Sequence, residues 1–303
     1  MARRIGIVSD LHFMLRNPSS RKDSYYEACF QKFEFILNQC DTLILLGDVF
    51  DKARTEDIVK NRILTLLNAY KKKVYVIPGN HDIEHDNIET LPNTSLGNLV
   101  YHNCVCMLTP ERIWNIDGLT VGVLEYKIEE AKKQEFQELD IVIGHHAYEW
   151  GRDLSQGLEE PDILRYNARF AFFGHDHQPY EPKQVGKTII YRTGSVMRDA
   201  LNAYTPNHHP SFMLFEEKNG SYGNPREIEI PHTPVEDAFR IEEKKIFKKC
   251  NKLVSEIKNF LQGVKMDNSN KKTVGQILRE DLNAPKEVID YLQLVYRVNH
   301  LEF

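Results

Sequence analysis

Short apolar segments alternate with longer segments of helical periodicity over the first eighty residues, and this alternation restricts the fold more than any other feature of the chain. Apolar runs of strand length occupy residues 4–8, 41–46 and 73–77. Between them, residues 23–39 and 55–70 repeat apolar side chains every three or four positions, as an amphipathic helix does. Strands joined by helices of this length imply right-handed crossovers and a mainly parallel sheet.

Beyond residue 100 the expected strands are shorter and follow one another more closely. Residues 211–217 are followed by a turn sequence and then by residues 226–230, which predicts a β-hairpin. Two strand-rich halves with helices outside them indicate an α/β fold, a two-sheet α/β/β/α sandwich, and we expect this core domain to span residues 1–232. The other strands expected in this part of the chain are 119–126, 140–144, 169–174 and 187–194.

The last seventy residues differ in composition from the rest of the chain. Residues 240–272 contain ten lysines and arginines against four acidic residues, and apolar residues recur there at helical spacing. We therefore expect residues 233–303 to form a small, basic, mainly helical C-terminal region. An amphipathic helix that packs on the core and exposes a solvated lysine face would give this pattern, and so would a surface that contacts phosphate groups.

Composition excludes several classes of protein. The chain has 303 residues, of which 41% are hydrophobic and 27% charged, as in ordinary globular domains. No apolar run reaches the roughly 20 residues of a membrane-spanning helix, and the N-terminal apolar stretch is too short for a signal peptide. The five cysteines have no framework spacing, so we expect a cytoplasmic protein, with Cys104 and Cys106 buried in a strand. The net charge of −5 means that any binding to nucleic acid depends on a local basic patch.

Side chains that can bind a metal or move a proton follow five of the expected strands. Because loops at the carboxyl ends of parallel strands converge on one crevice, we expect these side chains to meet. A glycine precedes most of them and allows the tight turn that directs a side chain back over the strand end. The groups are Asp10 and His12, Asp48 and Asp51, Asn80, His81 and Asp82, His145 and His146, and His175 and His177.

The chemistry of these donors indicates the kind of metal site. Carboxylates, imidazoles and an amide oxygen, with no thiolate in any of the motifs, suit Mn, Fe or Zn better than a structural cysteine site. Not every group named above need bind a metal. A set of seven donors would be too many for one ion and enough for two ions that share a carboxylate. Two such ions bind phosphate oxygens and lower the pKa of a bound water, which predicts phosphate-ester hydrolysis. Each motif alone has an ordinary explanation as a cap or turn, but their order at five strand ends favours the metal site.

As a set, the motifs D-x-H, G-D-x-x-D, G-N-H-D, a histidine after a strand and G-H-x-H resemble the calcineurin-like metallophosphoesterases. The resemblance covers residues 5 to about 200 and implies a metallophosphoesterase sandwich. It also implies two divalent metal ions, with Mn²⁺ as the first candidate and Fe, Zn or Mg as alternatives. One ion would be held by Asp10, His12, Asp48 and His177, and the second by Asp48, Asn80, His145 and His175, with Asp48 shared.

The same resemblance implies the catalytic residues. His81 would contact the phosphate and protonate the leaving oxygen, while Asp82 would orient the His81 imidazole and hold it cationic. From its place in the GDVFD sequence, and not from the resemblance, we expect Asp51 to support a ligand or hold the loop rather than bind a metal. His146 would lie outside the centre, because the family pattern uses the first histidine after the strand.

Finer features resemble the SbcD and Mre-eleven type DNA nucleases, including phage recombination nuclease subunits. They are the sequence GDVFD around Phe50 and the segment 189–202 with its Gly194-Ser195 turn. This resemblance implies a DNA exonuclease with endonuclease activity in recombination, replication or repair, with an SbcC-type coiled-coil ABC ATPase as partner; it is compatible with a homodimer. Residues 233–303 would then be a reduced cap or a partner-docking segment. A phosphodiesterase or phosphatase for small substrates such as cyclic nucleotides would share every catalytic residue and is the alternative.

Overall fold

The structure is a computed structural model, and the chain divides into two compact units, residues 1–238 and 239–303. The predicted C-terminal region, residues 233–303, lies almost entirely outside the described residues and stays a prediction. Within the described part of the chain, no helix combines the length and apolar character needed to cross a membrane. The described residues are 3–149, 157–202, 204–241, 286 and 289.

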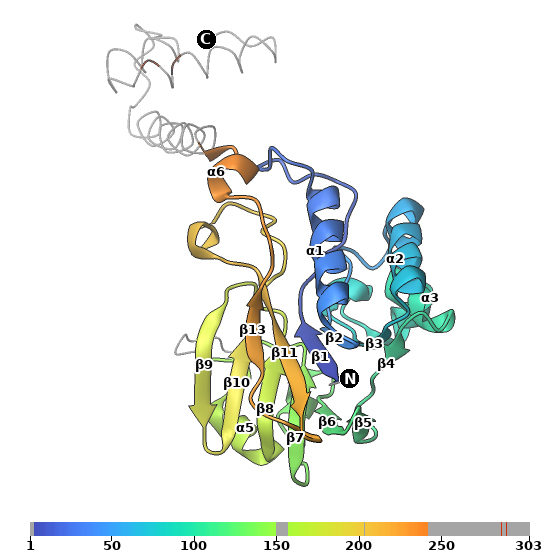
Figure 1. The fold of residues 1–303 in the computed structure, drawn as a ribbon, viewed down its shortest axis with the longest axis vertical. Helices are drawn as coiled ribbons and strands as arrows, with labels where there is room; N and C mark the ends of the chain where they lie inside the picture. Colours follow the sequence, from blue (N-terminus) through green and yellow to red (C-terminus); the bar gives the residue numbers. More distant parts are fainter. Residues whose placement is uncertain (1–2, 150–156, 203, 242–285, 287–288, 290–303) are drawn as a thin grey trace, which may run out of the picture. The chain divides into compact units, whose positions relative to one another are not determined.

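The first sheet contains the alternation seen in the sequence. Strands β1 (Arg4–Val8), β2 (Thr42–Leu46) and β3 (Lys73–Ile77) pair in parallel (Figure 1). They are joined by helices α1 (Tyr25–Gln39) and α2 (Asp57–Tyr70). The strands and helices predicted within residues 4–77 are therefore confirmed, with small shifts at their ends.

The last strands of the first unit return to this first sheet. Strand β11 (Ser211–Lys218) pairs antiparallel with β1, and both β12 (Ser221–Tyr222) and β13 (Arg226–Glu229) pair antiparallel with β11. The predicted hairpin is thus confirmed. At the opposite edge, β4 (Cys106–Met107) pairs in parallel with β3. Cys106 is exposed and Cys104 only half-buried, so the expectation that both are buried is wrong.

A second sheet of six strands has the order β5-β6-β7-β8-β10-β9. Its four central strands run parallel to one another, and the two edge strands are antiparallel to their neighbours. The strands predicted from the sequence in this half of the chain are confirmed. Their bounds are β5 (Trp114–Ile116), β6 (Leu119–Val123), β7 (Leu139–Gly144), β8 (Ala168–Phe173), β9 (Tyr180–Val185) and β10 (Thr188–Arg192).

Alternating side chains of β2 show how the layers are built. Ile44 faces the second sheet and packs with Ile141 and Phe172, while Leu43 packs with α1 on the outer face. Helices α4 and α5 cover the outer face of the second sheet. The predicted α/β/β/α sandwich is therefore confirmed. The remaining elements are η1 (Asn80–Asp82), η2 (Ile88–Asn93), α3 (Ser95–Tyr101), α4 (Ile128–Ala131), α5 (Glu160–Tyr166), η3 (Thr205–Asn207) and α6 (Val235–Ala238).

Candidate metal centre

The loops that follow β1, β2, β3, β7 and β8 meet at one edge of the sandwich. They bring together all seven side chains that the sequence predicts as metal ligands. The close approach of these loops to one another requires a glycine at positions 79 and 174. A Cβ at Gly79 would overlap the Asp48 carboxylate, and one at Gly174 would overlap the Ser9 hydroxyl. The convergence expected from strand polarity is therefore present in the structure.

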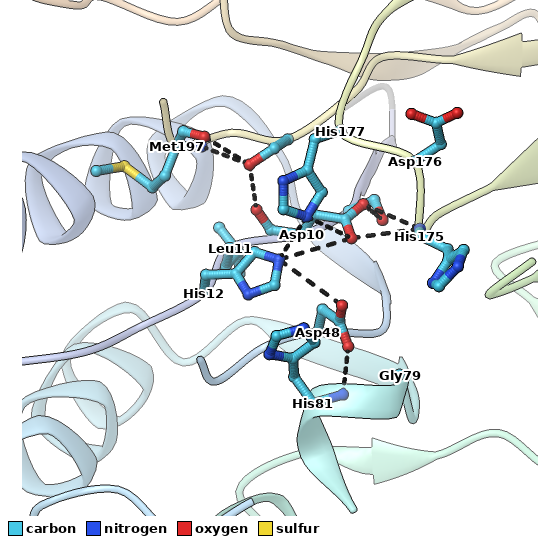
Figure 2. A network of polar contacts seen from close by, with 12 residues as sticks. Asp10, Leu11, His12, Asp48, Gly79, His81, His175, Asp176, His177 and Met197 are labelled. Atoms are coloured by element: carbon cyan, nitrogen blue, oxygen red, sulfur yellow. Dashed lines mark hydrogen bonds and ion pairs between the residues drawn. The ribbon is translucent and has the colours of Figure 1, made fainter. Parts of the chain in front are cut away.

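The first half-site consists of Asp10, His12, Asp48 and His177, whose donor atoms lie within 4.8 Å of one another (Figure 2). The Nε2 atoms of His12 and His177 are 2.9 Å apart. The His12 Nε2 atom is 3.7 Å from Asp48 Oδ2 and 3.9 Å from Asp10 Oδ1. Two imidazole nitrogens at this distance either share a proton or face a common cation. With two carboxylates beside them, they form a donor set that fits a divalent metal.

The second half-site consists of Asp48, Asn80, His145 and His175. The His145 Nε2 atom is 3.3 Å from both Asp48 Oδ2 and Asn80 Oδ1, and His175 Nδ1 is 2.9 Å from Asn80 Oδ1. His145 donates its Nδ1–H to the Leu46 carbonyl oxygen at 2.6 Å, which leaves Nε2 of the neutral ring free to bind a metal. Asp48 faces both half-sites, as a shared ligand must.

The neighbouring histidine lies outside the centre. His146 Nε2 is 2.8 Å from the Glu125 carbonyl oxygen, and the ring is buried. The structure therefore directs His145 towards Asp48 and His146 away from it.

Four of the seven predicted ligands have left-handed backbone conformations. Their φ angles are 55° at Asp10, 46° at His12, 48° at Asp48 and 84° at His175. Such conformations are strained for residues other than glycine and gather at functional sites, where the surrounding structure holds them. Here the His12 N–H donates to the Asp48 carbonyl oxygen at 3.0 Å, so the loops after β1 and β2 hold each other.

Burial controls the protonation of the centre. It raises the pKa of Asp10 and lowers the pKa of His12 to about 3. Burial acts to lower the pKa of His145, but the Asp48 and Asp10 carboxylates and the hydrogen bond to the Leu46 carbonyl together outweigh it and raise that pKa to about 9. A divalent ion must therefore displace a proton from His145, so metal affinity should fall with decreasing pH.

His81 lies beside the first half-site but is held by the loop after β2. Its backbone N–H donates to Asp48 Oδ1 at 2.9 Å, and its ring Nδ1 is 2.7 Å from the Asp51 carbonyl oxygen. The rings of His12 and His81 are 4.8 Å apart, and Asp51 forms a close group with both histidines. The second aspartate of the G-D-x-x-D motif thus orients His81 through its backbone, which the sequence analysis did not anticipate.

The expectation that Asp82 orients His81 is wrong. The Asp82 carboxylate is buried and accepts three backbone N–H groups, from Val49 at 3.2 Å and from Phe50 and Gly79 at 3.0 Å each. These bonds join the loop after β2 to the loop after β3. Asp82 therefore fixes the two loops. The role expected of Asp82 at the His81 imidazole is taken by the carbonyl group of Asp51.

Ser195 closes the centre on the side of the second sheet. Its Oγ–H group lies 3.1 Å from the Asp10 carbonyl oxygen, and its backbone N–H donates to the His177 carbonyl oxygen at 3.1 Å. The preceding Gly194 has a φ of 74°, and a Cβ there would lie 2.5 Å from the same His177 oxygen. The Gly-Ser turn noted in the sequence therefore supports the backbone of two predicted ligands.

Comparison with known proteins shows the family of the chain. A protein of Coxiella burnetii described as a probable cyclic nucleotide phosphodiesterase is 26% identical over 238 residues, covering 72% of this chain and 90% of that protein. Similar solved structures include a predicted phosphoesterase of Streptococcus pneumoniae (11% identity, TM-score 0.35, 76% of this chain and 98% of that one). Another similar solved structure is that of Vps29 of Chaetomium thermophilum (14% identity, TM-score 0.34, 77% of this chain and 98% of that one). The family model for calcineurin-like phosphoesterases matches residues 3–179, more than half of the chain, and the chain belongs to this family.

Proposed function

We propose that the protein is a metal-dependent phosphodiesterase with two divalent cations, one in each half-site. The observation that carries this proposal is the position of Asp48, whose Oδ2 atom is 3.7 Å from His12 Nε2 and 3.3 Å from His145 Nε2. Mn²⁺ is the first candidate, with Fe, Zn or Mg as alternatives, because the donors are carboxylates, imidazoles and one amide oxygen. Cations bound in such a centre lower the pKa of a water molecule and stabilise charge on phosphate oxygens.

In this proposal His81 is the general acid. Its Nδ1–H donates to the Asp51 carbonyl oxygen, which fixes the ring and leaves Nε2–H of the imidazolium for the leaving oxygen. The bond from the His81 backbone to Asp48 holds the acid at a constant position relative to the shared ligand. Asp82 contributes by keeping the loops that carry Asp48 and His81 together.

We propose DNA as the substrate, cleaved by exonuclease and endonuclease activity in recombination, replication or repair, with an SbcC-type ATPase as partner. The resemblance of the GDVFD sequence and of the Gly194-Ser195 turn to SbcD-type nucleases supports this proposal, as do the basic residues of 240–272. Phe50 itself is fully buried in the core, so it is a sequence signature and makes no contact with DNA.

Cyclic nucleotides are the second candidate substrate. The observation that favours them is the likeness to the Coxiella burnetii protein, whose description names a cyclic nucleotide phosphodiesterase. Both substrates present a phosphodiester to the same donors, so the metal centre does not distinguish them.

Parallel assays with Mn²⁺ test the proposal and separate the two substrates. The purified full chain is offered bis-p-nitrophenyl phosphate, linear DNA and a cyclic nucleotide, with the Asp48→Ala variant as the control for contaminating enzymes. Hydrolysis of the chromogenic diester and of DNA supports the nuclease. Cleavage of the diester and the cyclic nucleotide, with DNA left intact, favours the second candidate. Absence of hydrolysis of all three substrates contradicts the proposed activity.

A further inference from the structure

One face of α1 donates hydrogen bonds to backbone carbonyl groups around the metal centre. Tyr25, Cys29 and Lys32 stand four and three positions apart, and therefore on the same side of the helix. The Tyr25 hydroxyl donates to the His12 carbonyl oxygen at 3.1 Å, and the Cys29 thiol to the Leu11 carbonyl oxygen at 3.4 Å. We call these three residues, all buried, the α1 polar stripe.

Lys32 extends this stripe to the loop that follows β10. Its ammonium group donates to the Val196 carbonyl oxygen at 2.7 Å. The preceding residue is Ser195, whose hydroxyl and backbone N–H bond the carbonyl oxygens of Asp10 and His177. The single hydroxyl proton is shared between the carbonyl oxygens of Asp10 and Met197, at 3.1 and 2.6 Å, and the hydroxyl oxygen accepts the Met197 N–H, which keeps the turn compact. A short path of hydrogen bonds, continued by the peptide bond between Ser195 and Val196, thus joins Lys32 to the backbone of two ligands in the first half-site.

The surroundings of Lys32 make its presence costly. The side chain is only 5% exposed, and burial lowers the pKa of its amine to about 7. Arg198 and Arg21 also lower the pKa of Lys32, while the Cys29 thiol and Asp23 raise it. His208 is a further basic neighbour. Burying a cation beside two arginines opposes folding, and an apolar side chain would fill this position at lower cost. A lysine placed in such surroundings is a candidate for a role in function.

We propose that Lys32 is a positioning residue of the metal centre, which acts through Val196 and Ser195 on Asp10 and His177. This inference rests on the proposed two-metal phosphodiesterase. Lys32 touches neither the substrate nor a metal donor atom in this arrangement. Its removal should therefore change the affinity for metal in the first half-site and leave the interaction with the diester unchanged.

The test is a Mn²⁺ titration of bis-p-nitrophenyl phosphate hydrolysis by the full chain carrying Lys32→Met. Loss of a group that supports metal ligands typically weakens metal affinity roughly 10- to 100-fold, so the half-saturating Mn²⁺ concentration should rise by about this factor. The KM for the diester at saturating Mn²⁺ should stay at the wild-type value. Lys22→Met is the matched control, because Lys22 also donates to a backbone carbonyl, that of Glu236 at 3.0 Å, but at the surface.

A second set of variants separates positioning from a general effect on stability. Lys32→Arg keeps a charged donor and should restore the Mn²⁺ dependence towards the wild type. Ser195→Ala breaks the bond to Asp10 and should raise the half-saturating concentration in the same way. The double variant Lys32→Met with Ser195→Ala should show less than the sum of the two effects, because both act on one path.

The outcomes are distinct. An unchanged half-saturating Mn²⁺ concentration in folded Lys32→Met overturns the inference, whatever happens to the melting temperature. If Lys32→Met does not fold, Ser195→Ala decides the matter. Wild-type Mn²⁺ dependence in Ser195→Ala then overturns the inference. A wild-type protein that hydrolyses no diester would contradict the proposed function itself, before Lys32 is in question.

Discussion

The two half-sites share Asp48 but are supported in different ways. In the first half-site, Asp10 is 0% and His12 3% exposed, and their backbone is bonded by the α1 polar stripe and by Ser195. In the second, His175 is exposed and bonds Asn80, which is itself only half-buried. His145 is anchored to a strand, through the Leu46 carbonyl.

This difference shows how one fold can prepare two metal positions to different degrees. The first half-site is held by backbone contacts that exist without a metal, so an ion there meets donors already in place. In the second, Asn80 and His175 hold each other, and binding must also displace the proton of His145. We therefore expect the first position to bind its ion more tightly than the second.

Replacement of Asp48 should have the largest effect, because it removes the ligand common to both positions. Asp48→Ala should lose both ions and its phosphodiesterase turnover. Metal content measured by mass spectrometry after dialysis against Mn²⁺ checks this, with the exposed Asp57→Ala as control. One ion retained together with turnover would show that the two positions do not share Asp48.

Replacement of His81 should lower the rate without affecting either half-site. His81→Ala should bind both ions and lose roughly 10²- to 10⁴-fold in kcat on a diester with a poor leaving group, as general acids do. Loss on bis-p-nitrophenyl phosphate should be smaller, because nitrophenolate leaves without a proton. Rates of His81→Ala on the two diesters test this, and equal losses on both would argue against proton donation.

The pair His145 and His146 should define the limit of the second half-site. His145→Ala should lose the second ion and keep the first, since His145 is not one of the four donors of the first half-site. His146→Ala should keep both ions and lose about 1 kcal/mol of stability with its bond to the Glu125 carbonyl. Metal content and thermal unfolding of the two variants, compared side by side, measure the difference. Loss of an ion in His146→Ala alone would reverse the assignment.

The features that the sequence predicted depend on local patterns. The alternation of strands and helices follows from apolar periodicity, and the position of the donors follows from their place at strand ends. Because strand polarity brings these ends together, the sequence alone predicts that the seven side chains meet. Asp10 and His177 are an example, far apart in sequence and close in the structure.

The features that the sequence missed depend on contacts that no local pattern reports. The resemblance implied that Asp82 orients the His81 imidazole, but the Asp82 carboxylate accepts the N–H groups of Val49 and Phe50 in the loop after β2 and of Gly79 in the loop after β3. Lys32 belongs to the buried α1 polar stripe, whereas a lysine on a helix is ordinarily solvated. Its partner, Val196, is 164 residues away, and only the packing of α1 on the loop after β10 brings them together.

The last expected effect is on stability alone, without loss of a metal ligand, and concerns this α1 contact at different pH values. The pKa of Lys32 is about 7 in the folded protein, against 10.5 for an unburied lysine, because burial disfavours the ammonium form. Between these values the unfolded chain binds a proton that the folded chain does not. The free energy of unfolding should therefore rise with pH across this window, by at most about 1.4 kcal/mol per pH unit from this residue.

Lys32→Met should remove this contribution. Urea unfolding with a chelator present, at about pH 7.5 and about pH 9.5, should show a larger gain in stability for the wild type than for the variant. Arg21, Arg198 and His208 stay in both proteins, so their own contributions largely cancel in the comparison. Lys22→Met should behave as the wild type, because its side chain is at the surface. An equal gain in wild type and Lys32→Met would mean that Lys32 keeps its proton when buried. The ammonium would then reach the Val196 carbonyl as a full charge, and the first half-site would owe its rigidity to a bond that does not weaken with pH.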